Sequence, residues 1–186
     1  SSVAIDPRNT GIGVAAVQLQ SPSHTFLAND EDGASIGSQT IQISAPVVGK
    51  VVFFNIETGA ILSDQDAGYH PDMVTIGANG YCAVANEGEY AWSGNENIVP
   101  QAGASEFNSF QQPGSVSIYD LTAATIASLD AGGSGSAPAE LDIDFTGATN
   151  LSSVRYGTVE SIEPEYISFA GNTMFVACQE NNAIAI

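Results

Sequence analysis

The chain has 186 residues, and its 21 aspartates and glutamates outnumber its 3 lysines and arginines, which gives a formal net charge of −18. A composition with 44% hydrophobic and 13% charged residues is typical of a folded domain and excludes a disordered acidic tail. Three cations cannot neutralise a run of phosphates, and anionic lipids would repel the chain, so we exclude nucleic acids and anionic membrane surfaces as partners. No apolar run reaches the ~20 residues that a membrane span needs.

The near-absence of lysine also predicts a location. Dense negative charge is tolerated best where salt screens it, and Asn, Gln, Ser, Thr and Gly fill the polar positions instead. We therefore expect an extracellular or cell-surface protein, with the periplasm as an alternative.

Short runs of β-branched and aromatic residues, separated by Gly, Asn, Pro and Ser, predict strands along nearly the whole chain. In chain order, the predicted strands are 14–19, 24–29, 50–56, 60–66, 72–76, 81–86, 115–120, 124–129, 165–169 and 174–178, with a last one starting at 183. Only Leu121 to Leu129 could pass as a helix, and a glycine-serine run follows it closely. The predicted fold class is all-β.

Two sequence motifs recur along the chain in a fixed order. Residues 70–87 overlay 163–180 without a gap, and residues 49–56 match 114–121. A weaker copy of the first motif starts at Gly13. Repeated motifs with loops of variable length indicate a repeat architecture, and four antiparallel strands per repeat describe the blade of a β-propeller.

The repeat places only about two and a half blades in this chain, as a single partial propeller domain. The blades would span 14–66, 72–129 and, for the incomplete third blade, 165–186. Long insertions at 30–48, 87–113 and 130–162 would all leave the same rim, where function is usually found. Because a ring needs ~4–8 blades, we expect the remaining blades to come from the same, longer chain or from neighbouring subunits.

Several of these segments resemble one known family. They are 71–75, 84–89, 114–121, 163–167 and 179–184. They are similar to the repeated motifs of the choice-of-anchor I β-propeller domain, and the likeness runs from about residue 10 onward. The resemblance implies a secreted or surface-anchored propeller larger than this chain. Related proteins include mesenchyme-specific cell-surface glycoproteins linked to biomineral deposition, and some relatives are described as phosphatase- or phytase-like. The resemblance transfers no catalytic residue.

The predicted hairpins bring acidic residues to one end of the strands. In the second blade, His70 would lie across from Glu87 and Asp72 across from Ala85. The same register gives three further pairs, Glu163 with Glu180, Glu165 with Cys178, and Gly13 with Asp30. These strand ends would gather at the mouth of the central channel.

Crowded carboxylates repel one another unless they are protonated or bridged by a cation, and oxygen ligands without paired His or Cys suit Ca²⁺ or Mg²⁺. Ca²⁺ is therefore the expected cofactor. The alternative is that the same carboxylates cap backbone amides or are simply solvated. The candidate metal ligands are Asp30, Asp32, Asp72, Glu87, Glu89, Glu163, Glu165 and Glu180.

Few other residues suggest a site. Tyr90 and Trp92 could stack on a protein or glycan partner, or anchor their long loop against the scaffold. The two histidines fall on different blades, so we expect no catalytic histidine and interpret His70 as a hydrogen-bonding residue of the rim. Cys82 and Cys178 sit about three residues apart along equivalent strands, roughly 10 Å, and are predicted to be unpaired thiols.

Two functional interpretations remain. The first is a non-catalytic extracellular or cell-surface propeller segment that acts in adhesion, matrix or surface-layer assembly, with Ca²⁺ on its acidic face. The alternative is a metal-dependent phosphoester hydrolase of the propeller type. The first is favoured because no basic cluster that would hold a phosphate is visible.

Overall fold

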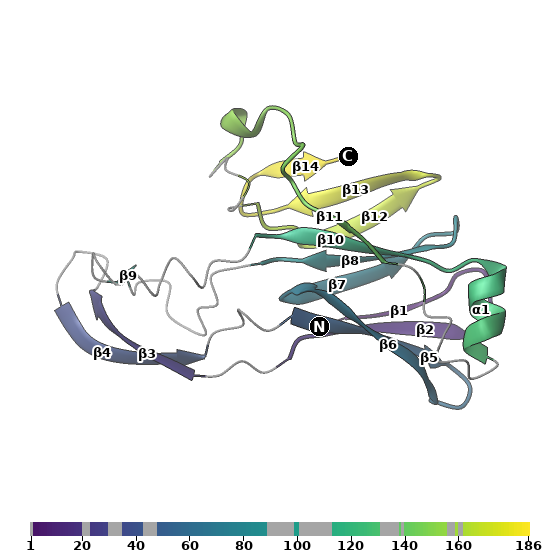
Figure 1. Cartoon of the computed structure of the whole chain (residues 1–186). Coiled ribbons are helices and arrows are strands. Elements are labelled where there is room, and N and C mark those ends of the chain that lie inside the picture. Colours follow the sequence, from purple (N-terminus) through teal and green to yellow (C-terminus); the bar gives the residue numbers. More distant parts are fainter. Residues whose placement is uncertain are drawn as a thin grey trace.

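Three antiparallel sheets are stacked face to face and a fourth, smaller sheet projects to one side of the stack (Figure 1). The structure is a computed structural model. It describes residues 2–19, 23–29, 35–42, 48–88, 99–100, 113–130, 138, 140–155, 159 and 162–186. Over these residues the class is all-β, as the sequence predicts, with one α-helix, and the stack is open and not a closed ring.

The three stacked sheets have the following strands. The first sheet contains β1 (Val3–Ile5), β2 (Ile12–Val17), β5 (Val48–Asn55) and β6 (Ile61–Tyr69), in this order. The second sheet contains β7 (Pro71–Ile76), β8 (Tyr81–Asn86), β10 (Ser115–Asp120) and β11 (Glu140–Ile143), in this order. The third sheet contains β12 (Tyr166–Ala170), β13 (Thr173–Cys178) and β14 (Ala183–Ala185), in this order.

The remaining elements lie in the connections between these strands. The projecting hairpin sheet has the order β4 (Ser35–Gln42), β3 (Ser23–Asn29), β9 (Val99–Pro100). Helix α1 (Ala123–Asp130) connects β10 to β11, and a short 3₁₀ helix (Leu151–Ser153) precedes the third sheet. In Figure 1 the hairpin sheet and α1 lie at opposite ends of the stack.

The alternation of side chains along the strands explains the stacking. In β5, for example, Gly49, Val51 and Phe53 are buried on one face while Lys50 and Val52 are half-buried on the other.

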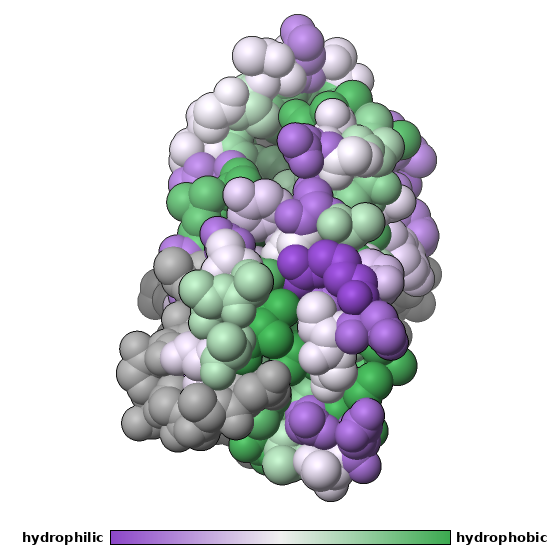
Figure 2. Space-filling view, turned by 90° about the vertical axis from the view of Figure 1, so that its right-hand side faces the viewer, coloured by the Kyte–Doolittle hydropathy of each residue, from purple (hydrophilic) through white to green (hydrophobic). Residues whose placement is uncertain are grey.

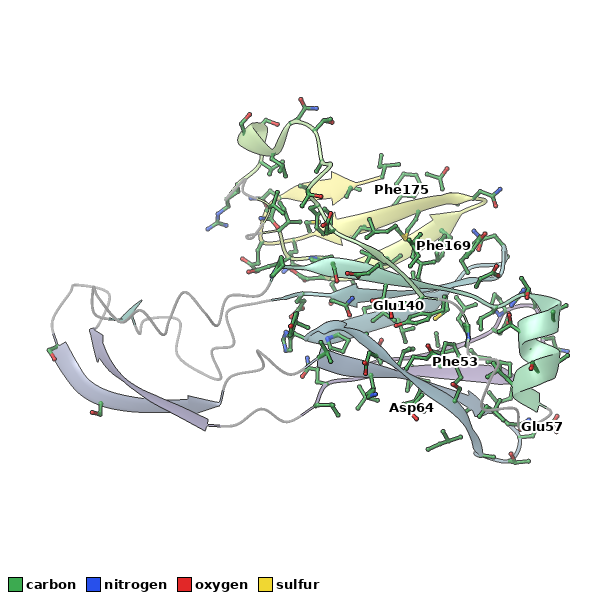
Figure 3. The ribbon with its side chains drawn as sticks, in the orientation of Figure 1. Phe53, Glu57, Asp64, Glu140, Phe169 and Phe175 are labelled. Carbon is green, nitrogen blue, oxygen red and sulfur yellow. The ribbon has the colours of Figure 1, made fainter. Side chains whose placement is uncertain are left out.

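Two apolar cores result, one in each gap between sheets. The first core includes Ile12, Val14, Phe53, Val84, Tyr119 and Leu121. The second core includes Ala83, Ala85, Val116, Ile167, Val176 and Cys178. Figure 3 shows Phe53 and Phe169 between the layers.

The inner edge strands are linked from sheet to sheet by matching hydrogen bonds. β1 contacts β7, and β7 contacts β12. The backbone amide of Val74 in β7 donates to the Ser2 hydroxyl at 2.6 Å. In the same way, the amide of Ile167 in β12 donates to the Met73 sulfur at 3.4 Å. Amides that point away from their own sheet therefore find acceptors on the preceding one.

The first sheet differs from the predicted strand assignment. The segment predicted as its first strand, 14–19, is the second strand, because β1 precedes it and pairs with it. The predicted strand 24–29 exists as β3 but belongs to the hairpin sheet. Gly13 lies opposite Ile5 and Phe54, so the expected pair with Asp30 is wrong. The three residues of β1, followed by the Asp-Pro-Arg turn, are too short to be recognised as a strand.

The segment predicted as strand 124–129 is α1, and the fourth strand of the second sheet is β11. The Thr122 hydroxyl accepts the Thr125 amide at 3.2 Å at the start of the helix, and Leu129 at its end is fully buried in the first core. Such a local cap and one buried anchor suffice for a short helix. The connection 130–162 therefore contains β11, and α1 lies on the rim opposite to the hairpin sheet (Figure 1).

The two cysteines are free thiols, as predicted, but they lie in different cores. Burial raises the pKa of Cys82 strongly and that of Cys178 to about 11. We expect neither to react with Ellman's reagent at pH 8 in the native protein, because the thiolate is the reactive form. Two thiols should react per chain after denaturation, and a mass two hydrogens lower with no labelling would contradict the prediction.

Candidate functional site

The candidate site is the rim where β6, β8 and β13 end and β7 and β12 begin, toward the hairpin sheet in Figure 1. Five of the predicted site residues belong to this acidic rim. They are Asp72, Glu87, Glu163, Glu165 and Glu180. The other predicted residues, Asp30, Asp32, Glu89, Tyr90 and Trp92, lie outside the described residues.

A single residue, His70, connects β6 to β7 and is held in the left-handed backbone region with φ 54°. Its Nδ1 lies 2.7 Å from Oε2 of Glu87, and both side chains are less than one fifth exposed. The backbone amide of Glu87 also donates to the His70 carbonyl at 3.1 Å. His70 therefore lies opposite Glu87, as predicted. Left-handed backbone at a bulky residue before proline is costly and persists only where the surroundings hold it.

Asp72 is not opposite Ala85, contrary to the prediction. Met73 pairs with Ala85 and Pro71 with Asn86, so that Asp72 is the extra residue of a β-bulge. A bulge redirects its side chain and ends regular pairing, which is why bulges often occur at sheet rims. Because the bulge shifts the pairing by one residue, Pro71 lies opposite Asn86, and His70 therefore lies opposite Glu87.

Glu165 links the acidic residues of the second and third sheets. Burial raises the pKa of its carboxyl, and the charges of Glu87, Glu180 and Asp72 raise it further. The Glu165 amide donates to the Ala177 carbonyl at 2.9 Å, which continues the register in which Tyr166 lies opposite Ala177. Three other predicted ligands therefore act electrostatically on Glu165 across the boundary between two sheets.

A buried amide, which the sequence analysis missed, positions the third-sheet part of the rim. Asn181 is fully buried, and its Oδ1 accepts the Glu163 backbone amide at 3.0 Å. Its Nδ2 donates to the Arg155 carbonyl at 3.1 Å, and the Arg155 amide donates to the Asn181 carbonyl at 3.1 Å. The chain before β12 is therefore tied to the turn after β13. No sequence signal distinguishes Asn181 from the neighbouring polar residues.

A second buried amide lies next to Glu87. Asn86 is fully buried, and its Nδ2 donates to the hydroxyls of Ser115 and Ser117 at 3.1 and 3.0 Å. A Cβ added at Gly68 on the first sheet would overlap the Asn86 amide and the Ser115 hydroxyl, so glycine is needed for this close approach. Asn86 therefore ties the end of β8 to β10 within the second sheet, and its amide packs closely against the first sheet at Gly68.

Three features limit the chemistry of the site. Among the described residues, no group of three or more His, Cys, Asp or Glu side chains is arranged to hold a metal ion. His24 lies in β3 of the hairpin sheet, whereas His70 lies on the acidic rim. In the part of the chain that the structure describes, Arg8 is paired with Asp6 at 2.6 Å and Lys50 with Asp66 at 2.6 Å.

Comparison with known proteins gives one finding. The family model of the choice-of-anchor I domain matches residues 1–186. No curated protein matches the chain, and no solved structure does. Among the described residues, there is no helix with the length and apolar character required to cross a membrane.

Proposed function

We propose that this chain, which belongs to the choice-of-anchor I domain family, is part of a cell-surface or extracellular β-propeller and serves as a non-catalytic binding or assembly module. The family's name relates it to anchoring at a surface, and the family model covers the whole chain. The strongly acidic composition fits a location where salt screens the charge. Its role would be adhesion or the assembly of a matrix or surface layer.

The propeller interpretation is supported by how the sheets stack. Each of the first two sheets is a four-stranded antiparallel unit, and the inner strands β1, β7 and β12 contact one another in succession. This is the relation between neighbouring blades around a channel. The first sheet and the third sheet would then each contact a further blade, from the same chain or from a neighbouring subunit.

The acidic rim is the proposed ligand site, with Ca²⁺ as the ligand. The observation that carries this proposal is the gathering of Glu87, Glu180 and Asp72 close enough to the partly buried Glu165 for their charges to raise its pKa, after burial itself. A divalent cation would relieve this repulsion, and carboxylates are the hard oxygen ligands that Ca²⁺ takes. Asp30, Asp32, Glu89 and Glu163 would supply further oxygens, and Tyr90 with Trp92 would contact a protein or glycan partner.

Calorimetric titration of the chain with CaCl₂ tests this proposal. We expect Glu87→Gln and Glu165→Gln each to weaken Ca²⁺ binding at least ~10-fold, since each removes a carboxylate charge from the site (about 1.4 kcal/mol). Glu57→Gln is the matched control, because Glu57 is an exposed acid in the turn before β6, at the end of the stack that carries α1 (Figure 3). Absence of Ca²⁺ binding, or equal weakening by the control, would contradict the calcium site.

We also expect Glu165→Gln to change the stability of the chain in a pH-dependent way. Because the pKa of Glu165 is raised in the folded state, the protonated carboxyl favours folding and the ionised carboxyl opposes it. The stability that the protonated carboxyl contributes is complete below the ordinary pKa of 4.5 and is lost as the pH rises through the folded pKa. We expect Glu165→Gln to raise the melting temperature at pH 7 by roughly 1–3 °C and to have no effect near pH 4. The measurement is thermal unfolding without Ca²⁺.

The non-catalytic assignment has its own test. The chain should hydrolyse no member of a phosphomonoester panel, with or without Ca²⁺. Turnover that Glu87→Gln abolishes would replace this proposal with a hydrolase function. The pairing of Arg8 and Lys50 with carboxylates supports this expectation, because the Arg8 guanidinium and the Lys50 ammonium group are each already held by a carboxylate and not by a phosphate.

A further inference from the structure

Only one asparagine of the 186 residues is followed directly by glycine, and this pair, Asn79 and Gly80, lies in the turn between β7 and β8. The backbone amide of Gly77 donates to the Tyr81 carbonyl at 2.9 Å, and the Gly80 amide donates to the Gly77 carbonyl at 3.0 Å. This is a three-residue hairpin loop whose last residue, Gly80, has φ 92°. A Cβ at Gly80 would also overlap the Arg8 guanidinium, so the turn requires glycine at this position.

An asparagine that precedes glycine loses its side-chain amide more easily than any other, because no Cβ on the next residue hinders ring closure. The backbone nitrogen of Gly80 attacks Cγ of Asn79 and forms a succinimide ring. The side-chain nitrogen takes up the proton of the attacking nitrogen and leaves as ammonia. Water then opens the ring at either carbonyl carbon and gives aspartate or isoaspartate. The net reaction consumes water, releases ammonia and replaces an amide with a carboxylate.

The Asn79 side chain also joins the second sheet to the third. Its Nδ2 donates at 3.0 Å to the carbonyl of Gly171, in the turn between β12 and β13, and its Oδ1 accepts the Tyr81 amide at 3.2 Å. A Cβ at Gly77 would overlap both this Oδ1 and the Phe169 ring, so the turn is in close contact with the third-sheet hairpin. The donor that crosses between the two sheets is therefore the nitrogen that the reaction removes.

The same contacts slow the reaction in the folded chain. The Gly80 nitrogen that must attack is donating to the Gly77 carbonyl, and the Asn79 amide is held at both of its polar atoms. Ring closure requires the side chain to rotate away from these partners, so it proceeds from conformations in which the two turns have locally separated. The rate of the reaction therefore reports how often the second and third sheets open at this end.

We propose that Asn79 is a site of spontaneous deamidation and that its conversion to aspartate or isoaspartate releases the third sheet from the second at this end of the stack. The new carboxylate has no N–H to donate, and it faces another acceptor, the Gly171 carbonyl. It also adds a negative charge to a chain whose formal net charge is already −18. Water does not restore the amide, so the change accumulates with the age of the protein.

Peptide mapping by mass spectrometry, after incubation at mildly alkaline pH, measures the modification. In the folded chain, we expect the product to form faster at Asn79 than at Asn172, which lies in the corresponding turn of the third sheet. Asn172 is the internal control because Thr173 follows it, and a β-branched side chain hinders ring closure. In urea, which separates the turns, the rate at Asn79 should rise about 3–10-fold.

Two results of this experiment would contradict the proposal. Conversion at Asn79 that is no faster than at Asn172 in the folded chain means that Asn79 is not the deamidation site. A rate at Asn79 that urea leaves unchanged means that the contact with Gly171 does not restrain the amide.

Asn79→Asp reproduces the change of amide to carboxylate in a homogeneous chain. We expect its melting temperature at neutral pH to fall by about 2–4 °C, because one hydrogen bond between the two sheets is lost. Hydrogen exchange of the amides in β12 and β13 should become faster. Asn172→Asp is the matched control, because it adds the same charge in the corresponding turn and leaves the bond between Asn79 and Gly171 in place. Asn79→Ala removes the donor without adding charge, so it should open the hairpin less than Asn79→Asp.

The outcomes separate this inference from the proposed calcium site. An Asn79→Asp chain that melts and exchanges like wild type overturns the release of the third sheet. If that variant does not fold, wild-type chain that has been aged in solution and separated by ion exchange gives the same comparison. The Asn79 turn lies at the end of the stack that carries α1, whereas Glu87 and Glu165 lie on the acidic rim at the other end (Figure 1). Each proposal can therefore fail while the other stands.

Discussion

Replacing Tyr119 with alanine should lower the free energy of unfolding by about 4 kcal/mol, because a large, fully buried aromatic side chain is removed from the first core. The ring packs edge-on against Phe53 of the first sheet, with centroids 5.8 Å apart. Its hydroxyl donates to the Asp66 carbonyl of β6 at 2.6 Å, so this one side chain of the second sheet contacts both β5 and β6 of the first sheet. A loss of this size lowers the melting temperature by roughly 10 °C.

Tyr119→Phe is the control that isolates the hydroxyl. It keeps the ring and removes one hydrogen bond, so it should cost only about 1 kcal/mol. Burial, followed by the nearby Glu140 charge, raises the pKa of Tyr119, so the hydroxyl remains a donor through the alkaline range. Denaturant unfolding of both variants gives the comparison, and an alanine variant as stable as the phenylalanine variant would contradict this role.

The hairpins of the second and third sheets could be predicted from sequence because two independent signals agree there. Alternating apolar residues mark the strands, and the repeat of 49–56 at 114–121 places β5 and β10 at equivalent positions, as the pairing confirms. The gapless overlay of 70–87 on 163–180 is nevertheless wrong by one residue in β8. Ile76 and Phe169 are equivalent in the overlay, but the partner of Ile76 is Cys82, with five residues between them, whereas the partner of Phe169 is Met174, with only four residues between them.

Two elements could not be predicted because tertiary contacts decide them. β1 has only three residues, and it becomes a strand because β2 offers an edge and the second sheet covers one of its faces. The segment of α1 has the apolar content of a strand, but burial of Leu129 against the first sheet stabilises a helix instead. Local propensity is too weak to choose between these outcomes.

The acidic rim was partly predictable, because hairpin register could be derived from the sequence. A hairpin register fixes which residues face each other, so the pair His70 and Glu87 followed from the sequence. Bulges and buried amides do not follow from it, because a polar residue looks the same in a loop whether it is solvated or buried. Asp72 and Asn181 are such residues, and their positions depend on contacts with residues that are distant in the chain.

Replacing Asp6 with alanine should destabilise the chain by about 3 kcal/mol, because it leaves a partly buried guanidinium without its partner. The Asp6 side chain is fully buried, and it accepts hydrogen bonds from Nε and Nη2 of Arg8 at 2.9 and 2.6 Å and from the Thr10 hydroxyl at 2.8 Å. The Arg8 side chain lies where a Cβ at Gly80 would be, and Gly80 has φ 92°. The Asp6 turn therefore fixes the first sheet against the second at the end of the stack that Figure 2 faces, where hydrophilic residues adjoin hydrophobic ones.

The pH dependence of this variant provides a specific check. Burial of the Asp6 carboxyl opposes its ionisation, but the hydrogen bonds from Arg8 and Thr10 outweigh burial, so the pKa of Asp6 is lowered. A lowered pKa contributes stability that is complete above the ordinary value of 3.8 and is lost as the pH falls through the folded value. Asp6→Asn should therefore be less stable than wild type at pH 7, and the gap should narrow toward pH 2. Arg8→Met in a double-mutant cycle isolates the pair, and a coupling energy near zero would show that Asp6 acts through its backbone turn alone.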